Sequence, residues 1–153
     1  MKNLSGILSQ QPLFKNLFAR HIEKIAQFAN EASFEAGEIL LKENAPASHF
    51  FLIQEGEVAL ESASRGAGYF TVQTVKAGES VGWSWLFVPY MNHFQARAAE
   101  PVRAIKVDGA ALLVHCETDH DLGHALMKCV VPTLVARLQE ARKRIVELSA
   151  INP

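Results

Sequence analysis

The chain has 153 residues, of which 49% are hydrophobic and 20% are charged, and its formal net charge is −1. This composition is typical of an ordinary globular domain, long enough to bury a core. The balanced charge argues against a nucleic-acid-binding protein and against attraction to an anionic membrane surface. The first residues lack the apolar core of a signal peptide, and no apolar run reaches the length of a membrane span. We therefore expect a cytoplasmic protein with neither nucleic acid nor membrane as a partner.

The first half of the chain combines short helices with short strands. Apolar residues recur at helical spacing between positions 11 and 29, which predicts one or two amphipathic helices with His21 on the solvated side. Short apolar runs follow and are separated by glycines, which indicates hairpin turns. We expect strands at 39–41, 49–53, 58–61 and 69–75, with turns at Gly37 and Gly56. Many short strands with glycine turns predict an antiparallel jelly-roll rather than a parallel sheet.

A closing strand and further helices are expected in the last third of the chain. Apolar and polar residues alternate at 102–107, which predicts a half-exposed strand. Asp108 is a good N-cap for a short helix at 109–116, because its carboxylate can accept from free backbone N–H groups. Asp119 or Asp121 is expected to cap the next helix in the same way.

The final helix carries a regular apolar seam. Its members, Met127, Val131, Leu134, Leu138, Ala141, Ile145 and Leu148, alternate in steps of four and three. This heptad period predicts a homodimer joined through Met127–Leu148, and the alternative is a helix that lies on its own sheet. Pro132 is expected to begin the long helix in its first turn or to kink it. Arg137 and the cations at 142–144 are expected on a solvated face.

Residues 77–98 stand out within the strand-rich region. They open with Gly78-Glu79, cross a tryptophan-rich run and end in strand-like residues after Pro89. A glycine and an acid before a short helical turn can present N–H groups to an anion, and a carboxylate accepts hydroxyl protons. The stretch resembles the phosphate-binding cassette of cyclic nucleotide-binding domains, which reads Gly-Glu, a short helix, then Pro-Arg-Ser/Thr-Ala. We call residues 77–98 the cassette segment.

The resemblance extends over nearly the whole chain. Its anchors are Gly37, Gly56, Gly78-Glu79, Ala96, Val102 and Arg137-Leu138-Gln139. It implies a mainly β protein with α-helices: an antiparallel double-stranded β-helix, or jelly-roll, flanked by N-terminal helices and a long C-terminal helix. It also implies one domain over 1–153, with N-terminal helices in 1–30, the β-roll in 31–108 and the last helices in 109–153.

The end of the cassette segment departs from the family pattern. Strand register, counted back from Phe94 and Ala96, puts Tyr90 at the arginine position and Met91 at the serine or threonine position. In family members that bind cyclic AMP or cyclic GMP, this arginine pairs with the cyclic phosphate and the glutamate takes a ribose hydroxyl. Tyrosine offers one neutral donor and methionine none, whereas a charge-assisted hydrogen bond contributes about 1.5–3 kcal/mol. We therefore expect both cyclic nucleotides to bind weakly or not at all.

No other cation is clearly placed to replace the arginine. Strand parity puts His93 and Arg97 on the face opposite to Tyr90, so neither should reach the ligand. Arg65 lies in a predicted loop and could reach in. Nothing in the sequence requires it to do so.

Two features of the cassette segment have alternative interpretations. Trp83 and Trp85 could form a ligand wall, or they could plug the space of an absent nucleotide. Glu79 could bind a ligand, or it could cap free N–H groups without one. The candidate ligand-binding residues are Gly78, Glu79, Ser80, Trp83, Tyr90, Met91, Asn92 and Phe94.

A regulatory role follows from the resemblance. The sequence stops at Pro153 without a helix-turn-helix, so we expect a stand-alone sensor module for signal transduction, acting on an unidentified protein partner. It would bind a cyclic nucleotide or another small anionic ligand in the β-roll, without the usual phosphate arginine. The alternative is a ligand-free dimeric interaction or adaptor protein with a plugged pocket.

Catalytic and metal chemistry find little support in the sequence. No nucleophile elbow or other catalytic motif is present, so we expect no enzyme and no catalytic residue. His120 and His124 would share a helix face at zinc-like spacing, but one segment would have to supply every ligand, so we expect no metal site. Cys116 and Cys129 are typical of buried reduced thiols in a cytosolic protein.

Overall fold

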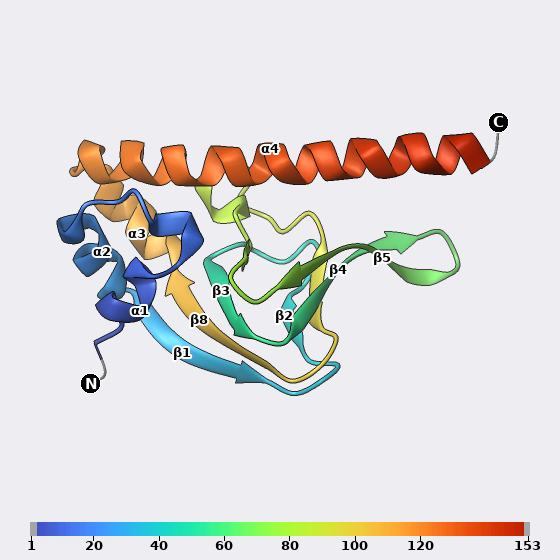
Figure 1. The fold of residues 1–153 in the computed structure, drawn as a ribbon, viewed down its shortest axis with the longest axis horizontal. Coiled ribbons are helices and arrows are strands. Elements are labelled where there is room, and N and C mark those ends of the chain that lie inside the picture. Colours follow the sequence, from blue (N-terminus) through green and yellow to red (C-terminus); the bar gives the residue numbers. More distant parts are fainter. Residues whose placement is uncertain (1–2, 152–153) are drawn as a thin grey trace.

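Two four-stranded antiparallel sheets form the body of the computed structural model, which describes residues 3–151. One sheet has the order β1-β8-β3-β6 and the other β2-β7-β4-β5. The strands are β1 (Ala29–Phe34), β2 (Ile39–Leu41), β3 (His49–Glu55), β4 (Glu57–Ser64), β5 (Gly68–Lys76), β6 (Ser80–Val81), β7 (Gln95–Ala98) and β8 (Val102–Asp108). This arrangement confirms the predicted antiparallel roll (Figure 1).

Helices gather along one side of the roll. They are α1 (Ser5–Ser9), the 3₁₀ turn η1 (Pro12–Phe14), α2 (Ala19–Ala26), the 3₁₀ turn η2 (Ser84–Leu86), α3 (Gly109–Cys116) and α4 (His120–Ile151). In Figure 1, α1, α2 and α3 cluster at one end of the roll, and α4 crosses it and extends past it beside the β4–β5 hairpin. None of these helices, over the described part of the chain, combines the length and apolarity of a membrane span.

The core divides into two parts. Between the sheets, the inner faces bury a mainly aliphatic cluster that includes Ile53, Val58, Val81 and Ala96. Between the helices and β3, a second cluster gathers the aromatic rings of Phe14, Phe50, Trp83 and Trp85 with Leu122 and Leu126 of α4. The strand β8 joins the two parts, because Val102 and Ala104 belong to the first cluster and Ile105 and Val107 to the second.

The N-terminal region departs from the sequence-based expectation. The predicted helical stretch contains only η1 and α2, whereas α1 precedes it and β1 begins at Ala29. The β1 sequence shows little apolar alternation and becomes a strand because it pairs with β8 over six residues. His21 was expected in solvent, but it is only 4% exposed. Helix α1 packs against α2, and the ring centroids of Phe18 and His21 are 5.8 Å apart.

The N-caps of α3 and α4 are aspartates, as the sequence predicted. The Asp108 carboxylate accepts from Ala111 N at 3.0 Å, which confirms the cap of α3. Of the two aspartates considered for α4, Asp119 does the capping and accepts from Leu122 N at 3.1 Å. Both bonds satisfy a backbone donor that the helix itself leaves free.

Pro132 lies inside α4 and does not begin it. The helix starts a dozen residues earlier, where Asp119 caps it and where Leu122, Leu126 and Val130 bury their side chains. Once these first turns are held by packing, the missing N–H of the proline costs one internal hydrogen bond without setting the helix start. Beyond Val130, no residue of α4 up to Ile151 is fully buried.

Candidate functional site

Gly78 and Glu79 form the turn between β5 and β6. Gly78 has a φ of +90°, a backbone conformation that suits glycine, and its N–H donates to Ile53 O at 2.8 Å. The Glu79 carboxylate accepts from Lys76 N at 2.9 Å, within the same turn. Of the two interpretations of this glutamate, its contacts fit the cap of a local turn.

The short helix of the cassette segment does not follow this turn directly. Strand β6 comes first, then Gly82 and Trp83, and only then η2. Gly82 has a φ of +98°, and a Cβ there would lie 3.0 Å from His49 O, so the backbone passes too close for a side chain. Gly82 and Trp83 therefore directly precede the short helix, and the Gly78-Glu79 pair, which the resemblance places there, lies before β6 instead.

The two tryptophans take different positions in the aromatic core. Phe50 stacks with both rings, at centroid distances of 4.5 Å to Trp83 and 5.4 Å to Trp85. Trp85 Nε1 donates to Gly82 O at 2.9 Å, so this residue is fully satisfied inside the core. Trp83 Nε1 is buried without a hydrogen-bond partner among residues 3–151, and its ring lines a cavity. The packing of Trp85 fits a plug, whereas Trp83 could also contact a ligand.

Three residues hold the cassette segment against the loop between β2 and β3: Tyr90, Met91 and Asn92. The carbonyl of Tyr90 accepts from Ala47 N at 2.8 Å, Met91 bridges to Pro46, and Asn92 Nδ2 donates to Lys42 O at 3.0 Å. These three candidates line neither of the two cavities described below. Register counted back along the strand does not reach them, because β7 begins only at Gln95 and parity does not hold through the turn before it.

A cavity of about 330 Å³ lies within the roll, beneath α4. Its lining is mostly apolar and includes no aspartate or glutamate. The lining residues are Leu60, Ser62, Val72, Gln73, Trp83, Ser84, Phe87, His93, Phe94, Leu134 and Arg137. Two of the predicted ligand-binding residues, Trp83 and Phe94, are among them. His93 also lines the cavity, contrary to the parity argument that placed it on the other face.

A larger hollow of about 1260 Å³ adjoins this cavity. It lies between α4, the N-terminal helices and the β5–β6 turn, and Gly78, Glu79 and Ser80 line it. Leu60 and Arg137 are among the residues that border both spaces. Five of the eight predicted site residues are therefore distributed over two neighbouring cavities, and the other three line neither.

Arg137 is the cation that sequence reasoning missed. Its side chain was expected on a solvated face, but it is half-buried and donates to the carbonyl oxygen of Ser80. Its own carbonyl accepts from Gln73 Nε2 at 2.9 Å, which fixes α4 against β5. The signal was present in the sequence, since positions 126, 130 and 137 share one side of a helix and the first two are buried leucine and valine.

Burial dominates the electrostatics of Arg137. Desolvation lowers the pKa of this guanidinium, and the nearby Glu79 carboxylate raises it, so the two effects oppose each other. Within residues 3–151, no carboxylate comes close enough to Arg137 to form an ion pair. The site therefore contains a partly desolvated positive charge that interacts with Glu79 without forming an ion pair.

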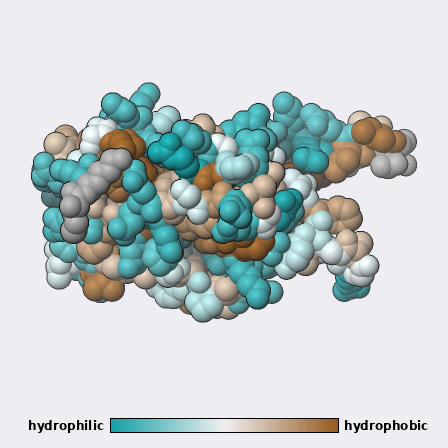
Figure 2. Space-filling model, turned by 90° about the horizontal axis from the view of Figure 1, so that it is seen from below, coloured by the Kyte–Doolittle hydropathy of each residue, from teal (hydrophilic) through white to brown (hydrophobic). Residues whose placement is uncertain are grey.

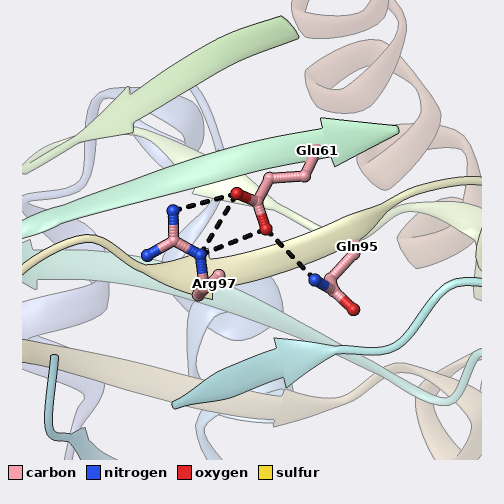
Figure 3. Close-up of polar contacts among 3 residues, drawn as sticks. All are labelled: Glu61, Gln95 and Arg97. Atoms are coloured by element: carbon pink, nitrogen blue, oxygen red, sulfur yellow. Dashed lines mark hydrogen bonds and ion pairs between the residues drawn. The ribbon is translucent and has the colours of Figure 1, made fainter. Parts of the chain in front are cut away.

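Arg97 pairs with Glu61 and lines neither cavity. Its guanidinium forms two-pronged contacts with Glu61, with Nη2 at 2.9 Å from Oε2, and Gln95 donates to the same carboxylate (Figure 3). This network lies on the face opposite to the buried Ala96 and Ala98, as the sequence predicted for Arg97. Arg65 lines neither cavity. Over the described residues, no group of three or more His, Cys, Asp or Glu side chains could hold a metal ion.

The comparisons with known proteins agree with this architecture. The cyclic nucleotide-binding domain family matches residues 31–119. A structure from Geobacter metallireducens GS-15, provisionally described as a cyclic nucleotide-binding protein, is 34% identical, with a TM-score of 0.80 over 88% of this chain and 97% of that one. A cyclic nucleotide-binding domain from Methylobacillus flagellatus KT is 21% identical, with a TM-score of 0.76 over 95% and 82%.

A more distant structure shares the fold alone. The regulatory subunit of a cAMP-independent protein kinase A from Trypanosoma brucei is 17% identical, with a TM-score of 0.70, and the match covers 95% of this chain and 50% of that one. No curated protein sequence matches the chain. The match over residues 31–119 and the identity over nearly the full length of the Geobacter structure lead to one conclusion. The chain belongs to the cyclic nucleotide-binding domain family.

Proposed function

We propose that this protein is a regulatory sensor module that binds a small molecule in the cavity of its β-roll and responds weakly, if at all, to cyclic AMP and cyclic GMP. The observation that carries the proposal is the cavity itself: it is preformed, mostly apolar and bordered by the half-buried cation Arg137. Pockets of this kind are the usual binding sites for small ligands.

The weak response to cyclic nucleotides follows from the lining. Among the described residues, no carboxylate lines this cavity to accept ribose hydroxyls, and Trp83 directly precedes the short helix. Tyr90, at the expected arginine position, lines neither cavity, and its backbone carbonyl accepts from the β2–β3 loop. Each lost charge-assisted bond weakens binding roughly ten- to hundredfold.

Calorimetric titration of both cyclic nucleotides tests the proposal. We expect no saturation at low-micromolar nucleotide for the unmodified protein. His93→Arg should improve cyclic AMP binding about tenfold or more, because position 93 lines the cavity and arginine can take a cyclic phosphate in two hydrogen bonds. The matched control is Tyr90→Arg, which should give no gain. Low-micromolar binding by the unmodified protein would overturn the proposal.

The second candidate is a dimeric adaptor that needs no ligand. Two observations favour it: the tryptophans already pack into the aromatic core, and α4 exposes an apolar seam. We propose a homodimer through Met127–Leu148 under either candidate; of the seam residues, Leu134 also lines the cavity. A ligand that raises the unfolding temperature, and loses this effect when the cavity is filled, would favour the sensor over the adaptor.

A further inference from the structure

The cavity in the roll has the lining of an apolar site, not of a nucleotide site. Trp83, Phe94 and Leu134 supply ring and aliphatic surface, and no acidic side chain is present. The Gln73 amide borders the cavity but already donates to the Arg137 carbonyl. A ligand seated here would therefore gain most of its binding free energy by removing apolar surface from water.

Arg137 supplies the single formal charge at this cavity. Its guanidinium donates to Ser80 O, forms no ion pair within residues 3–151, and is half-buried. A guanidinium has five N–H donors, so most of them remain available, and its planar fork matches a carboxylate. Glu79 acts on this charge without forming an ion pair, so an anion that enters the cavity would relieve the remaining cost of burying it.

Size and charge narrow the class of ligand. A volume of about 330 Å³ is near the lower end of the range for small-molecule pockets, which favours a compact ligand. The single cation Arg137 can pair with a ligand that carries one negative charge. Both the sugar and the phosphate of a nucleotide would meet apolar surface here, whereas an aromatic or aliphatic group would be well accommodated.

We propose that the ligand of this cavity is a compact apolar monocarboxylate, whose carboxylate binds Arg137 and whose ring or chain packs against Trp83 and Phe94. The inference rests on the proposed function, because it names the ligand class for the same cavity. It differs from the family resemblance in replacing a nucleotide by an acid without sugar or phosphate.

Phenylacetate is a suitable probe, and phenylacetamide is its uncharged control of nearly the same shape. Calorimetric titration of the full chain at pH 7 should show phenylacetate binding roughly ten- to hundredfold more tightly than phenylacetamide. Burial of the aromatic group should also change the fluorescence of Trp83, which lines the cavity. Equal affinity for acid and amide would overturn the assignment of the carboxylate to Arg137.

Variants distinguish the contribution of the Arg137 charge to binding from the contribution of the cavity space. Arg137→Gln should weaken phenylacetate binding to the level of phenylacetamide, and Arg137→Lys should keep part of the difference. The matched control Lys143→Gln removes a positive charge from an exposed position of α4 and should change neither affinity. Because Arg137 also ties α4 to the cassette segment, a second variant is needed: Ser62→Leu fills the cavity from β4 and should weaken both probes.

The outcomes distinguish this inference from the proposed function. Saturable phenylacetate binding that depends on Arg137 and is blocked by Ser62→Leu supports the inference. No phenylacetate binding at millimolar concentration, with cyclic nucleotides still weak, overturns the ligand class alone. Low-micromolar cyclic AMP binding would overturn the proposed function together with the inference.

Discussion

At the scale of single residues, the buried carboxylate of Glu61 is the clearest source of pH dependence. Its side chain is 7% exposed and that of Arg97 36%, and the two form the contacts of Figure 3. The hydrogen bond from Arg97 lowers the pKa of Glu61, against a smaller opposing effect of burial. The unfolded chain therefore binds a proton at Glu61 more readily than the folded chain, and acid shifts the equilibrium toward unfolding.

The lowered pKa of Glu61 predicts the direction in which the free energy of unfolding changes with pH. Glu61→Gln should lower the free energy of unfolding at pH 7 by about 1–2 kcal/mol, since a partly hydrated Arg97 limits the loss. The difference should persist above about pH 4.3, the ordinary glutamate pKa, and shrink as the pH falls below it. Urea unfolding at several pH values checks this. The control Glu57→Gln removes a carboxylate from the same strand but leaves the contacts between Glu61 and Arg97 in place, so it should cost less stability at pH 7.

At the scale of elements, the contact between η2 and α3 depends on a glycine. Gly109 begins α3 and is buried, and a Cβ there would lie 2.7 Å from Trp85 Cγ and nearer still to two other ring atoms. Trp85 is 1% exposed, so its ring has no room to move. The close approach lets α3 pack directly on the indole and fixes the end of the cassette segment that carries Trp83.

Gly109→Ala should therefore destabilise the protein by about 1–3 kcal/mol, the usual cost of overpacking a core. Chemical denaturation monitored by tryptophan fluorescence would measure it. The matched control is Gly6→Ala in α1, where a Cβ would meet no atom within 4 Å and alanine should slightly stabilise the helix. Equal effects of the two substitutions would contradict the packing argument.

At the scale of the whole molecule, sequence patterns predicted the roll better than the site. Glycine turns such as Gly56 and the alternation at 102–107 depend on local chemistry, so they located the strands. The site depends on tertiary placement. Arg137 was misassigned because a mixed charged face hides which side of α4 meets the roll. Strand parity gives no placement for Tyr90, because this residue lies before β7 begins. His21 was misassigned because neighbouring helices bury it.

The apolar seam of α4 leaves a large surface to be covered. Leu138 is 50% exposed and Ile145 is 63% exposed, although both belong to the predicted heptad. Figure 2 shows hydrophobic residues near the projecting end of the helix, apart from the tip of the β4–β5 hairpin. Exposed apolar surface of this extent and regularity favours a helical partner, and a second copy of the chain offers a self-complementary one.

Leu138→Glu tests the proposed dimer. We expect the unmodified chain to have the mass of a dimer in light scattering and the variant that of a folded monomer, because a charge in the seam would lose its hydration on association. The matched control is Gln139→Glu, which introduces the same side chain one residue further along the helix, about 100° around its axis and away from the seam. It should remain a dimer. A monomeric mass for the unmodified chain at high concentration would show that the seam does not join two copies, and circular dichroism of Leu138→Glu would establish that any loss of the dimer is not a loss of fold.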